Sequence, residues 1–159
     1  MSTAKPLYSG AASAVTITIA SLASNAYRQS AAVDNSANLY LDAVITGKIK
    51  SGASGTSATG FVTLYLYGYD GTQYSNNASG ADAAFTPDLQ ANLLPLFTLA
   101  VQANATTYYF PYLSVAAAAG LLYLPQKWGL ILFNGSGNAL DTTAGNHALE
   151  YQGINTQIV

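Results

Sequence analysis

The sequence predicts an all-β protein: an antiparallel β-sandwich or jelly roll of about eight strands, preceded by an extended N-terminal arm. Apolar and polar side chains alternate over several segments, most regularly over 38–50, and period two is the pattern of a half-buried strand. Clusters of Gly, Asn, Asp and Ser, which favour turns, separate most of these segments, and no segment shows a helical period longer than two turns. We therefore expect an arm over 1–12 and one sandwich domain over 13–159.

The first half of the chain supplies the arm and the first four predicted strands. Residues 1–12 are small and polar around one proline, which indicates an extended segment. β-Branched residues alternate over 15–19, and a short strand is expected over 27–32. A turn-forming DNSAN stretch then leads into 38–50. The aromatic strand 61–69 ends at Asp-Gly, which is a strong hairpin signal.

The 38–50 segment is expected to bury one face and to expose the other. The apolar face consists of Leu39, Leu41, Ala43, Ile45 and Ile49. The opposite face carries Tyr40, Asp42, Thr46, Lys48 and Lys50, with Val44 as its one apolar member.

The second half of the chain continues the series of strands after a long loop. Residues 76–92 are predicted to be loop with one short helical turn. Strands are expected over 93–102 and 106–116, and each contains a proline, which favours an edge position or the start of a strand. The apolar segment 128–134 is predicted to be a buried strand, and the alternating segment 147–154 closes the series.

The composition is unusually poor in charge. Only 8% of the residues are charged, against about 25% in an average soluble domain, and the net charge is −2. This excludes the basic surface of a nucleic-acid binder. Charge-poor surfaces are typical of the centres of interfaces, so we expect part of the surface to be covered by a partner. The stretch 115–124 is about half the length needed to span a membrane, and the alternating N-terminal region favours a strand over a signal peptide.

The sequence contains no pattern typical of an active site. The chain has no cysteine, and its seven acidic residues are spread singly, without the spacing of a calcium loop. His147 is the one histidine, with Asp141 or Glu150 as candidate orienting acids, but a structural role is the simpler interpretation. We therefore expect no enzymatic activity, no catalytic or metal-ligating residues and no cofactor.

Twelve tyrosines are the one compositional excess. On LYLYGY and TTYYFPY they alternate with other residues, so that one strand face is aromatic and bears hydroxyl groups. Three interpretations remain open: tyrosine as a strand former, as an interface residue, or as a platform that stacks on sugar rings.

Two long stretches carry a resemblance to a known group of proteins. The segments AYRQSAAVDNSANLYLDAVITGKIKSG and LPQKWGLILFNGSGNAL, with LYLYGYDG between them, resemble small structural proteins encoded beside the major capsid protein in tailed-phage genomes. The resemblance covers about residues 12–153 and rests on residue pattern, not on a catalytic signature. It implies a capsid decoration (cement) protein of jelly-roll type, located on the capsid surface of the virion and made in the cytoplasm of the bacterial host.

The partners that the resemblance implies are the major capsid protein and further copies of this chain, as a dimer or trimer. No nucleic acid and no membrane is expected as a partner. We expect the arm and the tyrosine-rich strands to make the contacts, through main-chain bonding at sheet edges and through aromatic side chains. The candidate partner-binding residues are Lys5, Pro6, Leu7, Tyr8, Tyr65, Tyr67, Tyr69, Tyr108 and Tyr112.

Two other functions stay open at this point. A glycan- or receptor-binding module of a phage fibre would expose several tyrosines, or Trp128, in a line beside Asn and Asp. A tail or connector component would assemble into rings.

Overall fold

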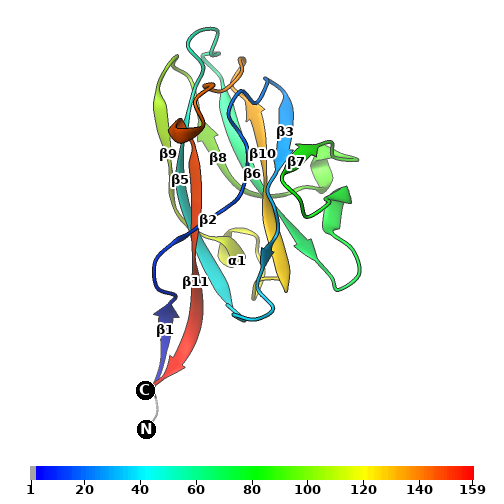
Figure 1. Cartoon of the computed structure of the whole chain (residues 1–159), viewed down its shortest axis with the longest axis vertical. Helices are drawn as coiled ribbons and strands as arrows, with labels where there is room; N and C mark the ends of the chain where they lie inside the picture. Colours follow the sequence, from blue (N-terminus) through cyan, green and yellow to red (C-terminus); the bar gives the residue numbers. More distant parts are fainter. Residues whose placement is uncertain (1–2) are drawn as a thin grey trace.

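In a computed structural model of the protein, which describes residues 3–159, two antiparallel sheets pack face to face (Figure 1). The first sheet has the order β1 (Ala4–Tyr8), β11 (Ala148–Ile158), β5 (Asp42–Lys50) and β9 (Thr107–Ser114), with β2 (Ser13–Ala14) also paired to β11. The second has the order β7 (Ala83–Phe85), β3 (Ala26–Gln29), β10 (Lys127–Gly135), β6 (Phe61–Tyr69) and β8 (Leu94–Ala100), with β4 (Val33–Asp34) also paired to β10. The predicted all-β sandwich is confirmed.

The strand order is that of a jelly roll. Eight of the strands in the described part of the chain have four or more residues, and they pair as a long hairpin that has been rolled up. The outermost pair is β1 with β11, and β3 pairs with β10. Next come β5 with β9, and β6 with β8. Successive strand pairs of this long hairpin therefore lie alternately in the first and the second sheet, which is the jelly-roll arrangement.

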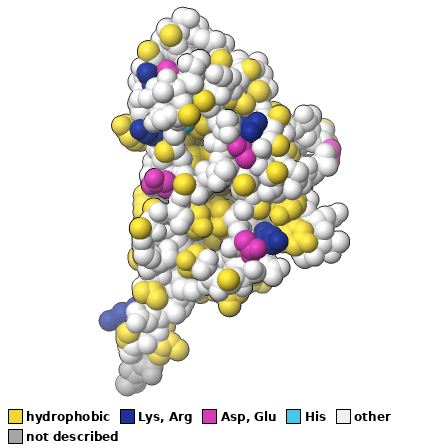
Figure 2. Space-filling model, in the orientation of Figure 1, with side chains coloured by type: hydrophobic (Ala, Val, Ile, Leu, Met, Phe, Trp, Pro, Cys, Tyr) yellow, Lys and Arg dark blue, Asp and Glu magenta, His cyan; other side chains and the backbone are white. Residues whose placement is uncertain are grey.

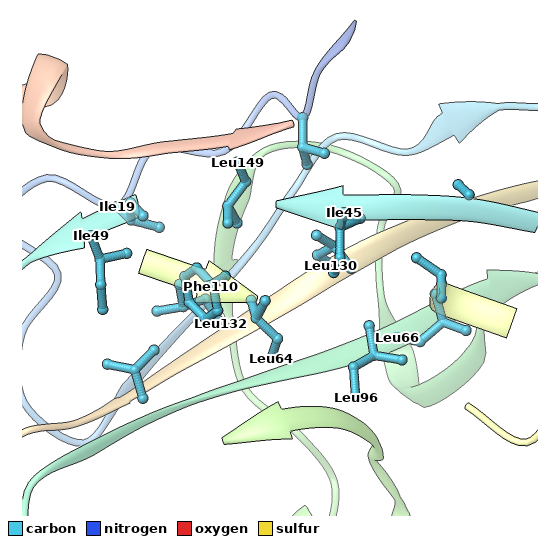
Figure 3. Packing of buried hydrophobic residues seen from close by; sticks show 14 of the residues in the cluster. Ile19, Ile45, Ile49, Leu64, Leu66, Leu96, Phe110, Leu130, Leu132 and Leu149 are labelled. Atoms are coloured by element: carbon cyan, nitrogen blue, oxygen red, sulfur yellow. The ribbon is translucent and has the colours of Figure 1, made fainter. Parts of the chain in front are cut away.

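The core lies between the sheets and is almost entirely aliphatic (Figure 3). Ile45 and Ile49 of β5 point toward Leu64 of β6 and toward Leu130 and Leu132 of β10. Leu130 and Leu132 are two positions apart, and Gly47 takes the inward position between Ile45 and Ile49, as period two requires. The core also contains Trp128, whose buried ring packs edge-on against Tyr151 with 5.4 Å between the ring centroids.

A second, smaller cluster covers the outer face of the second sheet. Tyr65 and Tyr67 of β6 point away from the core, but Tyr74 packs edge-on against Tyr67 with 5.7 Å between ring centroids, and the Gln90 side chain donates to the Tyr65 hydroxyl at 3.2 Å. The segment between β6 and β8, predicted to be loop with a helical turn, contains β7 and two short 3₁₀ turns (Ser75–Asn77 and Gln90–Asn92). Apart from β7, which is the edge strand of the second sheet, this segment therefore acts as a lid on the outer face of that sheet.

Two predicted strands differ from the structure: the strand predicted over 38–50 begins later, and the segment 15–19 is not paired as a strand. The 38–50 strand begins only at Asp42, so Leu39 and Leu41 are exposed and do not join the apolar face that was predicted. Residues 15–19 alternate as expected, with Val15 and Ile19 buried, but they cross between the sheets without ladder partners of their own. A short helix, α1 (Val115–Ala118), follows β9.

The predicted N-terminal arm contains β1, a strand of the first sheet; its first two residues lie outside the described part of the chain. β1 pairs along its whole length with the C-terminal part of β11, from Ala4 opposite Ile158 to Tyr8 opposite Ile154. Beyond Ile154, β11 leaves β5 behind, and the two strands project from the lower end of the sandwich (Figure 1). The predicted boundary at residue 12, between an arm and a sandwich domain, therefore lies between β1 and the rest of the first sheet, although β1 is a strand of that sheet.

Candidate interaction surface

The projection formed by β1 and residues 154–159 is called the ribbon below. All five residues of β1 are exposed, and the ribbon includes Leu7, Tyr8, Ile158 and Val159 among the exposed large apolar side chains. Ile158 is 75% exposed. Hydrophobic side chains are visible along the projection and at the lower end of the body in Figure 2. Two strands on their own are marginally stable in water, so this is an unusual place for apolar groups.

The backbone register of the ribbon is fixed at both of its ends. Thr3 and Val159 exchange two backbone hydrogen bonds, of 2.8 and 3.0 Å, and Ser9 donates to the Gly153 oxygen at 2.8 Å. Bonded positions alternate along an antiparallel pair. The odd-numbered residues of both strands therefore bond across the ribbon, and the even-numbered residues direct their backbone groups away from it.

The register also sorts the ribbon side chains into two faces, because directly opposite residues share a face. One face carries Ala4, Pro6, Tyr8, Ile154, Thr156 and Ile158. The other carries Lys5, Leu7, Asn155 and Gln157. The four arm residues predicted to bind a partner are thus all exposed, with Pro6 and Tyr8 on one face and Lys5 and Leu7 on the other.

Beside the base of the ribbon lies a group of exposed apolar residues, which we call the shelf. Its members are Leu39, Leu41, Leu121, Leu122 and Tyr123. Backbone bonds tie it to the ribbon base, since Leu41 donates to the Ile154 oxygen at 2.9 Å and Leu124 donates to the Leu41 oxygen at 2.9 Å. Leu122 is 94% exposed. The shelf was not among the predicted site residues.

The loop that presents Leu39 is held in a strained conformation. Leu39 is 67% exposed and has φ = 51°, a left-handed backbone that a branched side chain rarely adopts. Buried Asn35 holds the loop: its side chain accepts from the Tyr40 backbone N–H at 2.8 Å and donates to the Tyr40 oxygen at 2.9 Å. Behind the loop, Gly153 of β11 lies where any β-carbon would strike the Tyr40 ring, so this position requires glycine.

The outer face of the first sheet carries three tyrosines, Tyr8, Tyr109 and Tyr112, which we call the tyrosine face. Tyr109 is 70% exposed and Tyr112 is 63% exposed. Local desolvation and, after it, the neighbouring Tyr8 raise the pKa of Tyr112. The ribbon face with Tyr8 therefore continues onto the sheet, and this surface is uncovered, unlike the outer face of the second sheet.

A bulge in β9 explains why Tyr112 faces outward. Ile45 is opposite Leu113 but Gly47 is opposite Phe110, so β9 has one more residue than β5 between these two residue pairs. Without it, Tyr112 would share the inner face with Tyr108 and Phe110, because side-chain direction alternates. Tyr109 was missed at the sequence level, although its alternation with buried Phe110 is a usable signal.

Four predicted partner-binding tyrosines have structural roles inside the chain. Tyr65 and Tyr67 are buried beneath the lid, so the prediction that they contact a partner is wrong. The Tyr67 hydroxyl donates to the Ser30 oxygen at 2.6 Å, and burial raises the pKa of Tyr67 to about 12. Tyr69 is half-buried and stacks on Tyr74, with 4.8 Å between centroids.

Tyr108 is likewise engaged within the molecule. Its ring packs against the core, and its hydroxyl accepts from the backbone N–H groups of Gln102 and Ala103 at 3.1 and 2.7 Å. These bonds hold the loop between β8 and β9. Tyr108 therefore stabilises the fold at the end opposite the ribbon.

The single histidine and the acidic residues were the candidates for catalytic or metal-ligating side chains. His147 lies at 2.9 Å from the Asp141 backbone oxygen through Nε2, and its Nδ1 accepts from the Lys50 backbone N–H at 3.4 Å. Both ring nitrogens thus face backbone groups. No three His, Cys, Asp or Glu side chains of residues 3–159 lie together as metal ligands would. Nor is any helix in this range long and apolar enough to cross a membrane.

Comparison with known proteins does not place the chain in a group. No protein-family model matches the sequence, no curated protein matches it, and no solved structure matches the fold. The evidence for function is therefore the surface described above: a ribbon, a shelf and a tyrosine face on a jelly roll.

Proposed function

We propose that the chain is a non-enzymatic structural protein of a tailed-phage particle, a cement protein that attaches to the outer surface of the capsid through its tyrosine face. The observation that carries the proposal is the contrast between the two outer sheet faces. The second sheet is covered by the chain's own lid, with Tyr74 packed against Tyr67 and Gln90 bonded to the Tyr65 hydroxyl. The first sheet exposes Tyr8, Tyr109 and Tyr112 with nothing over them in the described chain.

The chemistry of the tyrosine face suits a protein partner. Tyrosine supplies a large, rigid contact area with a polar tip, and it is enriched in the centres of interfaces. Few charged groups surround it: Lys48 and Glu150 lie on the same face, beside Tyr109. A capsid presents the same site many times, so contacts of modest strength gain from repetition when the bound copies also touch one another.

Low overall charge supports the same proposal. With 8% charged residues and a net charge of −2, neighbouring copies on a shell repel one another little. The salt bridges of the described residues, Arg28 with Asp82, Lys50 with Asp141 and Lys127 with Asp34, neutralise three of the five cations. Figure 2 shows how few charged side chains lie on the visible surface.

The experiment is to locate the chain on particles of the phage that encodes it. Cryo-electron microscopy of purified particles is expected to show a jelly roll on the outer shell, with Tyr109 and Tyr112 at the contact. Replacement of both tyrosines by serine should strip the protein from the shell. The matched control is Leu89→Ser, which changes a comparably exposed apolar residue between β7 and β8, both of the second sheet. A chain located in the tail, or absent from particles, would refute the proposal.

Glycan binding by a fibre module is the second candidate, because Tyr109 is exposed beside Lys48 and Glu150, a combination able to stack on a sugar ring and to bond its hydroxyls. Trp128, the other predicted stacking residue, is fully buried and cannot contribute. A glycan array separates the two functions. Binding that disappears in Tyr109→Ala would favour the fibre module, and an array without hits, together with binding to shells, favours the cement protein.

A further inference from the structure

The ribbon leaves one edge of β11 open. Even-numbered residues of β11 direct their backbone groups away from β1, and Ile154 uses its oxygen to accept from Leu41. From Leu41 the chain runs back toward Asn35, and residues 35–40 hydrogen-bond to β11 only through a side chain, where Asn155 donates to the Asn38 oxygen at 3.2 Å, so β5 does not pair with the rest of β11. Within residues 3–159, the backbone groups of Thr156 and Ile158 on this edge have no hydrogen-bond partner.

The other edge of the ribbon is different. On β1, the outward-directed positions are Ala4, Pro6 and Tyr8, by the same alternation. Pro6 has no N–H, so the middle of this edge cannot donate. A strand that adds to the ribbon would therefore find a complete set of donors and acceptors on β11 and an incomplete set on β1.

We propose that two copies of the chain pair through their β11 edges, antiparallel and about a two-fold axis at Gln157. Thr156 of each copy then bonds with Ile158 of the other, which uses all four open backbone groups on each strand. The two ribbons become one four-stranded sheet, and four strands with an apolar face form a stable unit where two do not. The proposal does not depend on the capsid, since the pair forms in solution.

The side chains favour a second copy as the occupant. The side chains of residues 154–159 carry no charge, and Lys5, the one charged side chain of the ribbon, lies on the outer strand, so no like-charged side chains meet at the axis. In this arrangement the tip of each ribbon, with Ile158 and Val159, reaches the shelf of the other copy. The most exposed apolar groups of the ribbon and of the shelf thus cover each other reciprocally, as an isologous interface requires.

Area explains why the shelf belongs to the interface. A stable interface buries about 1,200–2,000 Å² in total, more than three residues of strand pairing supply. The shelf adds Leu39, Leu41, Leu122 and Tyr123 from each copy. It also accounts for the strained backbone at Leu39, because strain is kept where a side chain must be presented.

Disulfide formation tests the axis directly. The chain has no cysteine, so a disulfide in a single-cysteine variant joins two copies. Gln157 is a non-hydrogen-bonded position toward the second copy, where α-carbons lie about 4.5 Å apart, within disulfide reach. Under mild oxidation, Gln157→Cys should form a covalent dimer quickly. Lys5→Cys is the matched control: it is directly opposite Gln157 but lies on the outer strand, and it should stay monomeric on denaturing gels.

A pair of proline variants tests the edge. Thr156→Pro removes a donor from the open edge of β11, and Ala4→Pro removes one from the outer edge of β1; neither donor bonds within the ribbon. Both variants should melt like the unmodified chain. In sedimentation velocity, Thr156→Pro should raise the dimer dissociation constant about tenfold to a hundredfold, since symmetry removes two hydrogen bonds, while Ala4→Pro leaves it unchanged.

Three results would overturn the proposal. The first is a chain that remains monomeric at all accessible concentrations. The second is equal disulfide formation in Gln157→Cys and Lys5→Cys. The third is a dimer that Ala4→Pro weakens as much as Thr156→Pro, because that would place the contact on β1. Loss of shell binding without any of these would count against the cement function alone.

Discussion

The two ends of the sandwich satisfy their polar and apolar groups in opposite ways. At the end away from the ribbon, short polar side chains bind the loops to one another: Ser51 donates to the Ala103 oxygen at 2.6 Å, and Asn104 accepts from the Thr56 N–H at 2.9 Å. At the ribbon end, leucines and tyrosines are exposed, and Thr156 and Ile158 leave backbone groups open. We call the first of these the polar end.

This difference between the two ends shows which interactions are formed within one chain and which are left for a partner. Buried Ser51 and Ser136 at the polar end donate to backbone oxygens within the chain, so that end contributes to folding. Exposed apolar groups at the ribbon end contribute little to folding and much to association. Substitutions at the two ends should therefore separate stability from self-association.

The largest effect is expected at buried Asn134 of β10. Its amide nitrogen donates to the oxygens of Leu22 and Asn138 at 2.8 and 2.9 Å, and its oxygen accepts from the Ser136 N–H at 3.1 Å. Asn134→Ala leaves these groups without partners and should lower the free energy of unfolding by about 2–4 kcal/mol in urea titrations. Self-association of the folded protein should be unchanged. A loss below about 0.5 kcal/mol would show that the network is not a stabilising unit.

At Leu122 of the shelf we expect the reverse: a small effect on stability and a large effect on self-association. Because this side chain is 94% exposed, Leu122→Asp should change the free energy of unfolding by no more than about 0.5 kcal/mol. The same substitution should abolish the dimer in sedimentation velocity, since it places two carboxylates in an apolar contact. Leu89→Asp is the matched control, because Leu89 is exposed outside the ribbon end. Equal behaviour of the two variants would remove the shelf from the interface.

At Leu39 we expect two smaller effects of opposite sign: a more stable fold and a weaker dimer. Asparagine tolerates the left-handed backbone far better than leucine does, so Leu39→Asn should raise the free energy of unfolding by about 0.5–1 kcal/mol. The dimer should be weaker, because an apolar contact is lost. Thermal unfolding and sedimentation of the same preparation measure both. A variant that is more stable and associates equally well would show that the strain at Leu39 has no role in assembly.

The smallest effect concerns pH and the polar end. Hydrogen bonds from the Asn146 amide and the Thr143 N–H, with Lys50 nearby, outweigh desolvation and lower the pKa of Asp141 from 3.8 to about 2. A carboxyl whose pKa is lower in the folded state stabilises the fold above the unfolded pKa. This contribution should disappear as the pH falls from 3.8 to about 2.

Asp141→Asn provides the control for this titration. In denaturant unfolding across the acidic range, the variant should lose less stability than the unmodified chain. Nuclear magnetic resonance of the carboxyl should give the low pKa directly. An unshifted Asp141 carboxyl would contradict the assignment.

The strands of the fold were predictable from the sequence because side-chain alternation is local information. Segments such as 61–69 and 128–134 alternate or are apolar throughout, and they form β6 and the buried part of β10. The pairing of the strands was not predictable in the same way, because it depends on contacts between distant residues. The start of β5 was misjudged, since Asn35 turns the chain away before Asp42 although Leu39 and Leu41 keep the alternation.

The exposure of the candidate site residues was predictable from the sequence only where it depends on a single strand. The arm residues Lys5 to Tyr8 are exposed because no other element covers β1. Tyr65 and Tyr67 were assigned to a correct strand face, but a segment with little pattern of its own covers that face. Tyr112 depends on the bulge of β9, and the shelf on two loops that meet only in the folded chain.

Pro6 determines where growth of the joined sheet would stop. Once β11 of one copy lies against β11 of another, the outermost strands are the two β1 strands, and each lacks a donor at its centre. Proline at a sheet edge is a known barrier against further strand addition and against fibre formation. A closed pair is thereby favoured over an endless polymer, so a concentrated stock of this charge-poor protein should remain dispersed where a Pro6→Ala stock would slowly gel.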